Sequence, residues 1–338
     1  MKEILEKLSS KVNLDEQEAY SAMMSIMNGE YTPAQIAGFL MGLRMKGETV
    51  PEISGFVRAM RDKACKVDGP AGMLDTCGTG GDGASTFNVS TAAAIVTAAA
   101  GVPVAKHGNK SVSSKCGSAD VFQQLGVKID MQPEHAQSCL HEVGLAFLFA
   151  PVYHPSMKHA VVPRREMGIR TVFNILGPMS NPAGVKKQVV GVFNMPTAEK
   201  MIQVLKNTGS DHVLVIHSDD GLDEISISAD TQVFELANGE IRQQKLRPED
   251  MGIQRQVLSS INGGDAETNA GIIRNMLNGV KGPQMDITAF NAGAAIYTSG
   301  NAASIHEGVR IAYDTILSGR AKRKLADLIN FSSSVPAN

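Results

Sequence analysis

The spacing of apolar positions changes along the chain, and near its start the spacing is typical of helices. Through residues 1–65 the apolar side chains recur about every 3.6 residues, as on one face of a helix. Thr32 and Pro33 supply an N-cap and a first-turn proline, and Pro51 marks the start of a further helix. We therefore predict a small helical domain over residues 1–65, followed by an irregular linker.

Beyond the linker, short apolar runs alternate with helical segments. Strands are predicted within residues 102–108, 126–130, 187–193, 212–220 and 225–241. Helical patterns at 133–144 and 197–209 lie between them, and the last third of the chain is mostly helical. This order favours an α/β domain over residues 70–338, with a mostly parallel central sheet flanked by helices.

Composition narrows the class of protein. The 338 residues are 43% hydrophobic and 20% charged, and no apolar run reaches the roughly 18 residues of a membrane span. The charged start argues against a secretory signal, and the four cysteines have no metal-ligand spacing, so we expect a cytoplasmic protein. A net charge of −2 argues against nucleic acid as the main partner.

Four glycines between Gly78 and Gly83 stand in the stretch DTCGTGGDGASTFNVST, directly before a predicted helix. Glycine clusters let the backbone come close to a ligand, and a helix start attracts phosphate. The P-loop pattern is excluded because no Lys-Ser/Thr pair follows. A dinucleotide site is disfavoured because Asp82 lies within the loop and the next acid is Asp120. A pyrophosphate site without a base pocket remains, and so does a plain tight turn.

A second loop, KHGNKSVSSKCGSAD from Lys106 to Asp120, is rich in lysine, serine and glycine. Such a stretch is poor as helix or strand and suits either an anion site or a solvated surface. It lies one predicted helix and one predicted strand after the glycine cluster. That arrangement favours two halves of one anion-binding site.

Two further stretches carry charge. HSDDGLDEIS contains four carboxylates from Asp219 to Glu224, and Mg²⁺ prefers oxygen ligands of this kind. VPRREMGIR offers Arg164, Arg165 and Arg170, and arginine binds a carboxylate through a bidentate fork. Either stretch is also compatible with an ordinary charged surface.

These four motifs, in this order, and the segment VVPRREMGIRTVFNILGPMSNPAG resemble the anthranilate phosphoribosyltransferase family over nearly the whole chain. The resemblance implies transfer of the phosphoribosyl group of 5-phosphoribosyl 1-diphosphate (PRPP) to the amine of anthranilate. The products are N-(5-phosphoribosyl)anthranilate and pyrophosphate, on the pathway to L-tryptophan. It also implies Mg²⁺, a nucleoside phosphorylase/phosphoribosyltransferase type of fold, a homodimer through the helical domains, and residues 161–184 packed close to the helical domain.

The resemblance also assigns residues by motif. It places PRPP at Gly78, Gly81, Asp82, Thr86, Asn88, Val89, Ser90, Thr91, Lys106, His107, Gly108, Asn109, Lys110, Ser111, Val112, Ser113, Ser114 and Ser118. It places Mg²⁺ at Ser90, Asp223 and Glu224, and anthranilate at Gly78, Asn109, His154, Arg164 and Pro178, with His107 nearby. Lys106, His107, Asn109 and Arg164 are the expected catalytic residues.

Two alternatives stay open from the sequence. A pyrimidine nucleoside phosphorylase shares the helical-plus-α/β architecture and a variant of the lysine loop. A non-catalytic relative that binds nucleic acid keeps the fold with altered donor loops. His107 is either a proton acceptor or a structural histidine, and strong general-base catalysis is not expected because an aromatic amine is neutral before attack.

Overall fold

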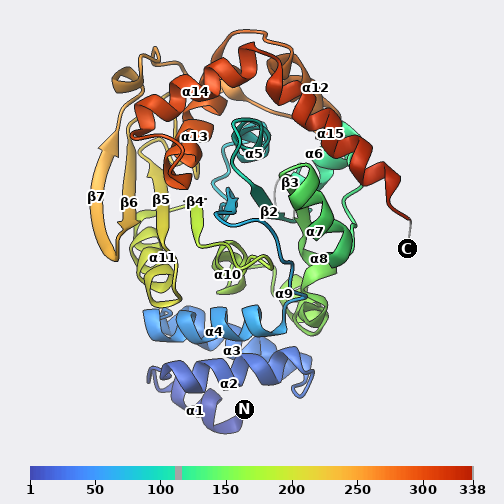
Figure 1. Cartoon of the computed structure of the whole chain (residues 1–338). Helices are drawn as coiled ribbons and strands as arrows, with labels where there is room; N and C mark the ends of the chain where they lie inside the picture. The colour runs from blue at the N-terminus through green and yellow to red at the C-terminus, as the bar shows by residue number, and fades with distance from the viewer. Residues whose placement is uncertain (111–115, 337–338) are drawn as a thin grey trace.

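The computed structural model describes residues 1–110 and 116–336. Four helices come first: α1 (Lys2–Ser9), α2 (Glu16–Met27), α3 (Pro33–Lys46) and α4 (Val50–Lys63). The side chains of Asp15, Thr32 and Thr49 cap the last three of them, each within a capping box. Figure 1 shows these helices, in blue, as a layer at one end of the molecule.

A seven-stranded sheet forms the centre of the larger part of the chain. Its strands are β1 (Leu74–Asp75), β2 (Val104–Gly108), β3 (Leu145–Phe149), β4 (Lys187–Gly191), β5 (His212–Ser218), β6 (Thr231–Ala237) and β7 (Glu240–Leu246). They lie in the order β3-β2-β1-β4-β5-β6-β7, parallel from β3 to β5 and antiparallel thereafter. The expectation of a mostly parallel sheet is therefore confirmed.

Helices cover both faces of this sheet. The remaining α-helices are α5 (Val89–Ala99), α6 (Ser118–Leu125), α7 (Pro133–Glu142), α8 (Ala150–Tyr153), α9 (Lys158–Met167), α10 (Phe173–Met179), α11 (Met195–Asn207), α12 (Ala266–Leu277), α13 (Pro283–Ser299), α14 (Ile305–Leu317) and α15 (Arg320–Ser334). Three short 3-10 helices occur at Pro155–Met157, Pro248–Met251 and Leu258–Ile261. Helix α13 packs on α5, β4 and β5, whereas α11 packs between β5 and α4 (Figure 1).

Alternation along β5 explains this two-sided covering. Leu214 and Ile216 belong to the apolar cluster that contains α5 and α13, whereas Val213 and Val215 belong to the cluster that contains α11 and the first four helices. Because successive side chains of a strand point to opposite faces, β5 contributes side chains to both apolar clusters, one on each face of the sheet. Segment 161–184 returns toward the N-terminal helices, because α9 packs on α2 and α3 while α10 packs on α4.

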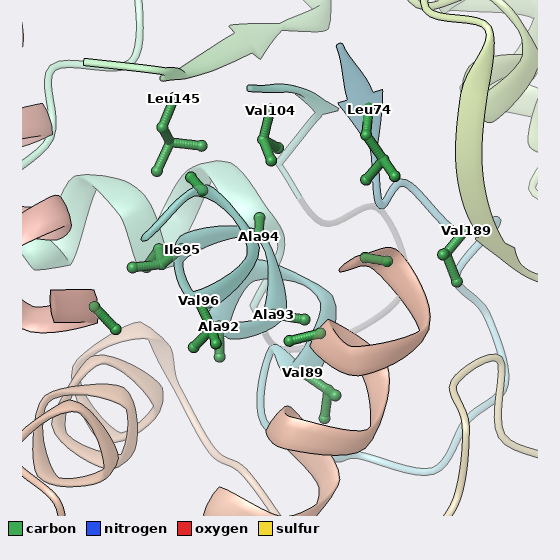
Figure 2. Close-up of a cluster of buried hydrophobic side chains, with 14 of the residues drawn as sticks. Leu74, Val89, Ala92, Ala93, Ala94, Ile95, Val96, Val104, Leu145 and Val189 are labelled. Carbon is green, nitrogen blue, oxygen red and sulfur yellow. The ribbon is translucent and has the colours of Figure 1, made fainter. Parts of the chain in front are cut away.

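Helix α5 is buried on nearly every side. Figure 2 shows Val89, Ile95 and Val96 of this helix among apolar side chains from the neighbouring strands and helices. Small alanines let the helix approach the sheet closely, and Leu74, Val104 and Leu145 come from the three strands that lie above it in Figure 2. The helix start is thereby fixed at one edge of the sheet.

The structure corrects some predicted elements. Residues 126–130 were expected to form a strand but have no regular structure, and they lead from α6 into α7. Strands β1 and β3 were missed, β1 because it has only two residues. The long C-terminal helical pattern is two helices, because Gly319, with φ of 73°, separates α14 from α15.

Candidate active site

The motifs meet where the parallel strands end. Strand β1 leads into the glycine-rich loop, β2 carries Lys106 and His107 toward the second loop, and β5 leads into the acidic turn at 219–224. Carboxyl ends of adjacent parallel strands meet at one edge of a sheet, which is the usual place for a ligand site in such folds. Motifs that are far apart in the sequence therefore lie close together at this edge of the sheet.

The glycine-rich loop is bonded to its surroundings through its backbone. The N–H of Thr79 donates to Gly191 O at 2.8 Å, and the N–H of Gly80 donates to Asp223 Oδ2 at 2.7 Å. A Cβ on Gly78 would meet Gly191 O at 3.1 Å and Asp223 Oδ2 at 3.2 Å. Glycine is needed at position 78 because the loop approaches the acidic turn so closely.

The second acidic residue of the turn faces the start of α5. Glu224 Oε1 accepts the N–H of Ser90 at 3.0 Å, where the helix dipole favours negative charge. Asn291 of α13 holds the backbone just after it, since Asn291 Oδ1 accepts the N–H of Ile225 and Asn291 Nδ2 donates to Ile225 O, both at 2.9 Å. Asn291 lies outside every motif found in the sequence.

The other two carboxylates of the turn are used differently. Asp219 accepts from the side chains of Gln232 and Lys245 at the surface. Asp220 accepts from Ser226 Oγ at 2.6 Å, which shapes the turn itself. Of the four acids, only Asp223 and Glu224, the inner pair, are bonded to the glycine-rich loop and to the start of α5.

The surroundings of Asp223 and Glu224 raise the pKa values of both carboxyl groups. The pKa of the Asp223 carboxyl is raised by burial and by the neighbouring Asp82, and the pKa of Glu224 is raised by burial and by Asp223. Adjacent half-buried carboxylates with raised pKa values favour a bound cation that offsets their charge. Within the described residues, no group of three or more His, Cys, Asp or Glu side chains is arranged as metal ligands. Two carboxylates fit Mg²⁺, which usually completes its shell with water and phosphate oxygens.

The residues expected from the second loop are only partly described. Lys106 is 1% exposed, and its ammonium donates to Thr76 O at 3.2 Å and Thr76 Oγ1 at 3.3 Å, beneath the glycine-rich loop. Asn109 O accepts the N–H of Ala119 at 3.2 Å and the hydroxyl of Ser118 at 3.4 Å, which brings the loop ends together. Gly108 ends β2, and the N–H of Lys110 donates to Asn109 Oδ1. Ser111, Val112, Ser113 and Ser114 lie outside the described residues.

Residues at the start of α5 divide into two groups. Asn88 Nδ2 donates to Cys116 O at 3.3 Å, and Asn88 Oδ1 accepts from Asn269 Nδ2 at 2.9 Å, so this side chain joins the helix start to the end of the second loop. Val89 and Thr91 are buried in the core, with 1% and 0% exposure. Only their backbone groups are therefore available to a ligand. Thr86, between the glycines and α5, forms an isolated antiparallel bridge with Asn262, which follows the last 3-10 helix.

Two buried histidines lie together on the opposite side of β2. The rings of His107 and His154 are 5.2 Å apart between centroids. Burial lowers the pKa of His107 to about 3 and that of His154 to about 4, so both are neutral at physiological pH. His107 Nδ1 lies 3.1 Å from Gly177 O, whereas His107 Nε2 is buried and has no hydrogen-bond partner among the described residues. A carbonyl partner assigns the proton to Nδ1 and leaves Nε2 as an acceptor.

Arginines of α9 and the turn after it stack on aromatic rings. The Arg164 guanidinium lies 5.0 Å from the centre of the Phe173 ring, and burial lowers its pKa. Among the described residues it has no carboxylate partner. Phe173 begins α10, and Pro178 lies near the end of the same helix, where Pro178 O accepts from Gln188 Nε2 at 2.7 Å.

Arg170, which received no role from the sequence, contacts the glycine-rich loop. Its guanidinium stacks 4.7 Å from the centre of the Phe193 ring and donates to Gly81 O. Gly81 has φ of 83°, and a Cβ there would meet Arg170 Nη2 at 2.9 Å. The arginine segment and the glycine-rich loop therefore touch directly.

Comparison with known proteins agrees with this arrangement. The model of the glycosyl transferase family a/b domain matches residues 71–322, and that of its helical bundle domain matches residues 2–64. The anthranilate phosphoribosyltransferase of Thioalkalivibrio sulfidiphilus is 52% identical over 99% of both chains. The chain belongs to the anthranilate phosphoribosyltransferase family. The expected family, fold and enzyme class are confirmed, and the transfer of a phosphoribosyl group to anthranilate is the activity of this family.

Solved structures support the same assignment. The anthranilate phosphoribosyltransferase of Thermus thermophilus superposes with a TM-score of 0.93 at 40% identity, covering 98% of this chain and 99% of that one. The Saccharomyces cerevisiae enzyme in complex with PRPP and Mg superposes with a TM-score of 0.91 at 28% identity, covering 98% of each chain. The expectation of Mg²⁺ as the cofactor is thus confirmed at the level of the family. Neither the phosphorylase nor the nucleic-acid-binding alternative is supported.

Proposed function

We propose that this chain carries out the family's transfer at the edge of the sheet where the glycine-rich loop meets the acidic turn. PRPP lies over the backbone of Gly78 to Asp82 and the start of α5, with Asn88 and Ser90 beside it. The second loop, from Lys106 to Lys110, and Ser118 close the site from the other side. The single observation that carries the proposal is the direct bonding of the turn carboxylates to Gly80 and Ser90.

In this proposal Asp223 and Glu224 hold Mg²⁺, with the Ser90 hydroxyl as a further ligand. The ion supplies positive charge that offsets the charge of pyrophosphate as it leaves. Lys106 adds a buried ammonium beneath the glycine-rich loop, where low exposure strengthens its field. Other backbone N–H groups of the glycine-rich loop are offered to the phosphate oxygens.

The acceptor is placed by the arginine segment. Anthranilate's carboxylate pairs with Arg164, which is half-buried, stacked on Phe173 and free of carboxylate partners among the described residues. Pro178, His154, Asn109 and Gly78 form the remainder of the acceptor site. A cation that lacks an anion in a partly desolvated site fits a carboxylate ligand.

The chemistry then needs positioning more than acid–base catalysis. The C1–O bond of the ribose breaks, the amine nitrogen forms the new C1–N bond, and pyrophosphate departs with the electron pair of the broken bond. The nitrogen loses one proton after attack, and His107 Nε2, which is neutral and has no hydrogen-bond partner among the described residues, can accept it. Most of the rate acceleration then comes from holding the amine nitrogen of anthranilate close to C1 of the ribose in a reactive geometry.

Anthranilate fluorescence tests this proposal. We expect fluorescence to be lost only when PRPP and Mg²⁺ are both present, and EDTA to stop the reaction. Uridine or thymidine with phosphate is the parallel assay. Turnover of a nucleoside with phosphate, together with none of anthranilate, would replace the proposal with a nucleoside phosphorylase.

We also propose a cytoplasmic homodimer joined through the N-terminal helices. Exposed apolar side chains support it: Met41 and Met45 lie one turn apart on α3, and Val12 precedes α2. Val161 and Val162 of α9, which packs on α3, are exposed as well. No helix among the described residues is long and apolar enough to cross a membrane.

A further inference from the structure

We propose that Asn181 and Asp75 are positioning residues for this reaction: together they hold the end of β2, and with it His107, against the segment that carries Pro178. The inference rests on the proposed placement of the two substrates. Neither residue belongs to the donor, metal or acceptor set given above. Both are buried, with exposures of 5% and 0%.

The contacts join three segments that are distant in sequence. Asp75 Oδ1 accepts the backbone N–H of His107 at 3.2 Å, and Asp75 Oδ2 accepts from Asn181 Nδ2 at 2.7 Å. Asn181 Nδ2 also donates to Ala105 O at 2.8 Å. Asn181 Oδ1 accepts the N–H of Ala183 at 2.8 Å, so both ends of the amide are used.

The shortness of β1 explains why side chains are needed here. Strand β1 pairs with β2 only at Leu74 and Val104, and then turns away into the glycine-rich loop. On its other side β2 continues to pair with β3 as far as Gly108. The groups of Ala105 and His107 that face β1 therefore lack a strand partner. Asn181 and Asp75 bond the Ala105 carbonyl and the His107 N–H in place of the missing strand.

The same connection reaches the acceptor side of the site. Asn181 follows α10, the helix whose Gly177 O bonds the ring of His107 and whose Pro178 O is held by Gln188. His107 is thus fixed by its backbone through Asp75 and by its ring through Gly177. A shift of Asn181 moves His107 and Pro178 relative to each other, and reaction rates are sensitive to displacements of that kind.

The charge state of Asp75 suits this role. Burial raises the pKa of Asp75 to about 6, while Lys106 and the Asn181 amide oppose the rise. At pH 8 the carboxylate is therefore mostly ionised, and it needs hydrogen-bond donors such as the Asn181 amide and the His107 N–H. Asn181 supplies one of them and leaves its own oxygen for Ala183.

A double-mutant cycle tests the proposal. Asn181→Ala and Asp75→Asn are each expected to lower kcat/KM for anthranilate by about tenfold or more, through lower kcat and weaker acceptor binding. Combining Asp75→Asn with Asn181→Asp restores one amide-to-carboxylate bond and keeps an acceptor for the His107 N–H, while the Ala105 carbonyl loses its donor. We expect this reversed pair to recover about tenfold over the worse of the single variants Asp75→Asn and Asn181→Asp, each measured alone, whereas independent structural effects would multiply.

A control separates positioning from loss of stability. Glu52 of the helical domain is fully buried and accepts the N–H of Leu14 at 2.9 Å, far along the chain from the site. Glu52→Gln is expected to lower Tm while leaving the KM of both substrates at the wild-type value. If Asn181→Ala is not folded, Asn181→Ser replaces it, and the dissociation constant for anthranilate is measured by fluorescence alongside Tm.

The outcomes distinguish this inference from the proposed function. Folded Asn181 and Asp75 variants with wild-type kcat and KM would overturn the inference alone, as would a reversed pair whose losses simply multiply. Wild-type protein that does not consume anthranilate with PRPP and Mg²⁺ would overturn the proposed function itself. Loss of acceptor use in the single variants, with rescue in the reversed pair, establishes the positioning role.

Discussion

Asp223 Oδ2 accepts the N–H of Gly80 at 2.7 Å, across 143 residues of sequence. This bond joins the acidic turn directly to the glycine-rich loop, with no ligand between them. Beside it, Glu224 accepts the N–H of Ser90 at the start of α5. The carboxylates proposed to bind the metal and the backbone proposed to bind the phosphates are therefore one connected unit.

Removing the inner carboxylates tests their assignment. The Asp223→Asn and Glu224→Gln double variant is expected to lose most turnover and to need far more Mg²⁺, because it lacks the two carboxylates proposed to hold the ion. Asp219→Asn is the matched control and should change little, since Asp219 bonds Gln232 and Lys245 at the surface. Greater damage from Asp219→Asn would move the metal to the outer end of the turn.

The same carboxylates should lower the stability of the metal-free protein. Asp223 and Glu224 are adjacent and half-buried, and their raised pKa values indicate that the charged forms are disfavoured. Asp223→Asn keeps an acceptor for Gly80 but removes a charge, so we expect a higher Tm than wild type without Mg²⁺. Adding Mg²⁺ should raise the Tm of wild type more than that of the variant, because only wild type binds the ion well. Calorimetry with and without Mg²⁺ measures both; a lower metal-free Tm for the variant would contradict this account.

Arg164 should control use of the acceptor. Losing one partner of a charged hydrogen bond costs roughly 1.5–3 kcal/mol. At about 1.4 kcal/mol per tenfold, Arg164→Ala should weaken anthranilate use by on the order of ten- to a hundredfold. The KM for PRPP should barely change, and Arg164→Lys should recover only part because lysine lacks the planar fork. A large rise in the KM for PRPP alone would place Arg164 at the phosphates.

Two buried histidines should make the fold sensitive to acid. Their pKa values in the folded protein, about 3 and about 4, lie below the ordinary value of 6.5. Their neutral forms therefore favour the folded state fully above pH 6.5, and this contribution is lost as pH falls from 6.5 toward 4. Unfolding by urea across this range should show a decline of roughly 1 kcal/mol or more per histidine.

His154→Gln should flatten this dependence on pH, whereas His306→Gln, at an exposed position of α14, should keep the wild-type slope. The comparison between variants isolates the histidine contribution from that of the buried carboxyl groups. Equal slopes for wild type and His154→Gln would show that His154 becomes protonated in the folded protein without cost.

Self-association should depend on the exposed face of α3. Met45 is 73% exposed, so Met45→Glu places a charge in the proposed contact and should shift the protein toward monomer in sedimentation experiments. Val257→Glu is the control, because Val257 is 69% exposed on the α/β part of the chain. A dimer that survives Met45→Glu but not Val257→Glu would move the interface to the other end of the molecule.

The sequence by itself determined those features that depend on neighbouring residues. Thr32 and Pro33 predicted the start of α3 because capping uses groups within one turn. The glycines from Gly78 to Gly83 predicted a loop, and the alternation of strands and helices predicted the parallel sheet. The motif order was enough for the family, because each motif is local and carries its own chemistry.

Only the tertiary structure decided which of these groups meet. Sequence spacing alone does not distinguish Asp223 from Asp219, whereas the fold bonds the first to Gly80 and leaves the second on the surface. Val89 and Thr91 follow a donor motif, yet the fold buries their side chains in the core. Asp75 and Asn181 had no assignable role, because their role follows from where β1 ends beside β2. Such contacts are set by the close packing of distant segments, which no local pattern encodes.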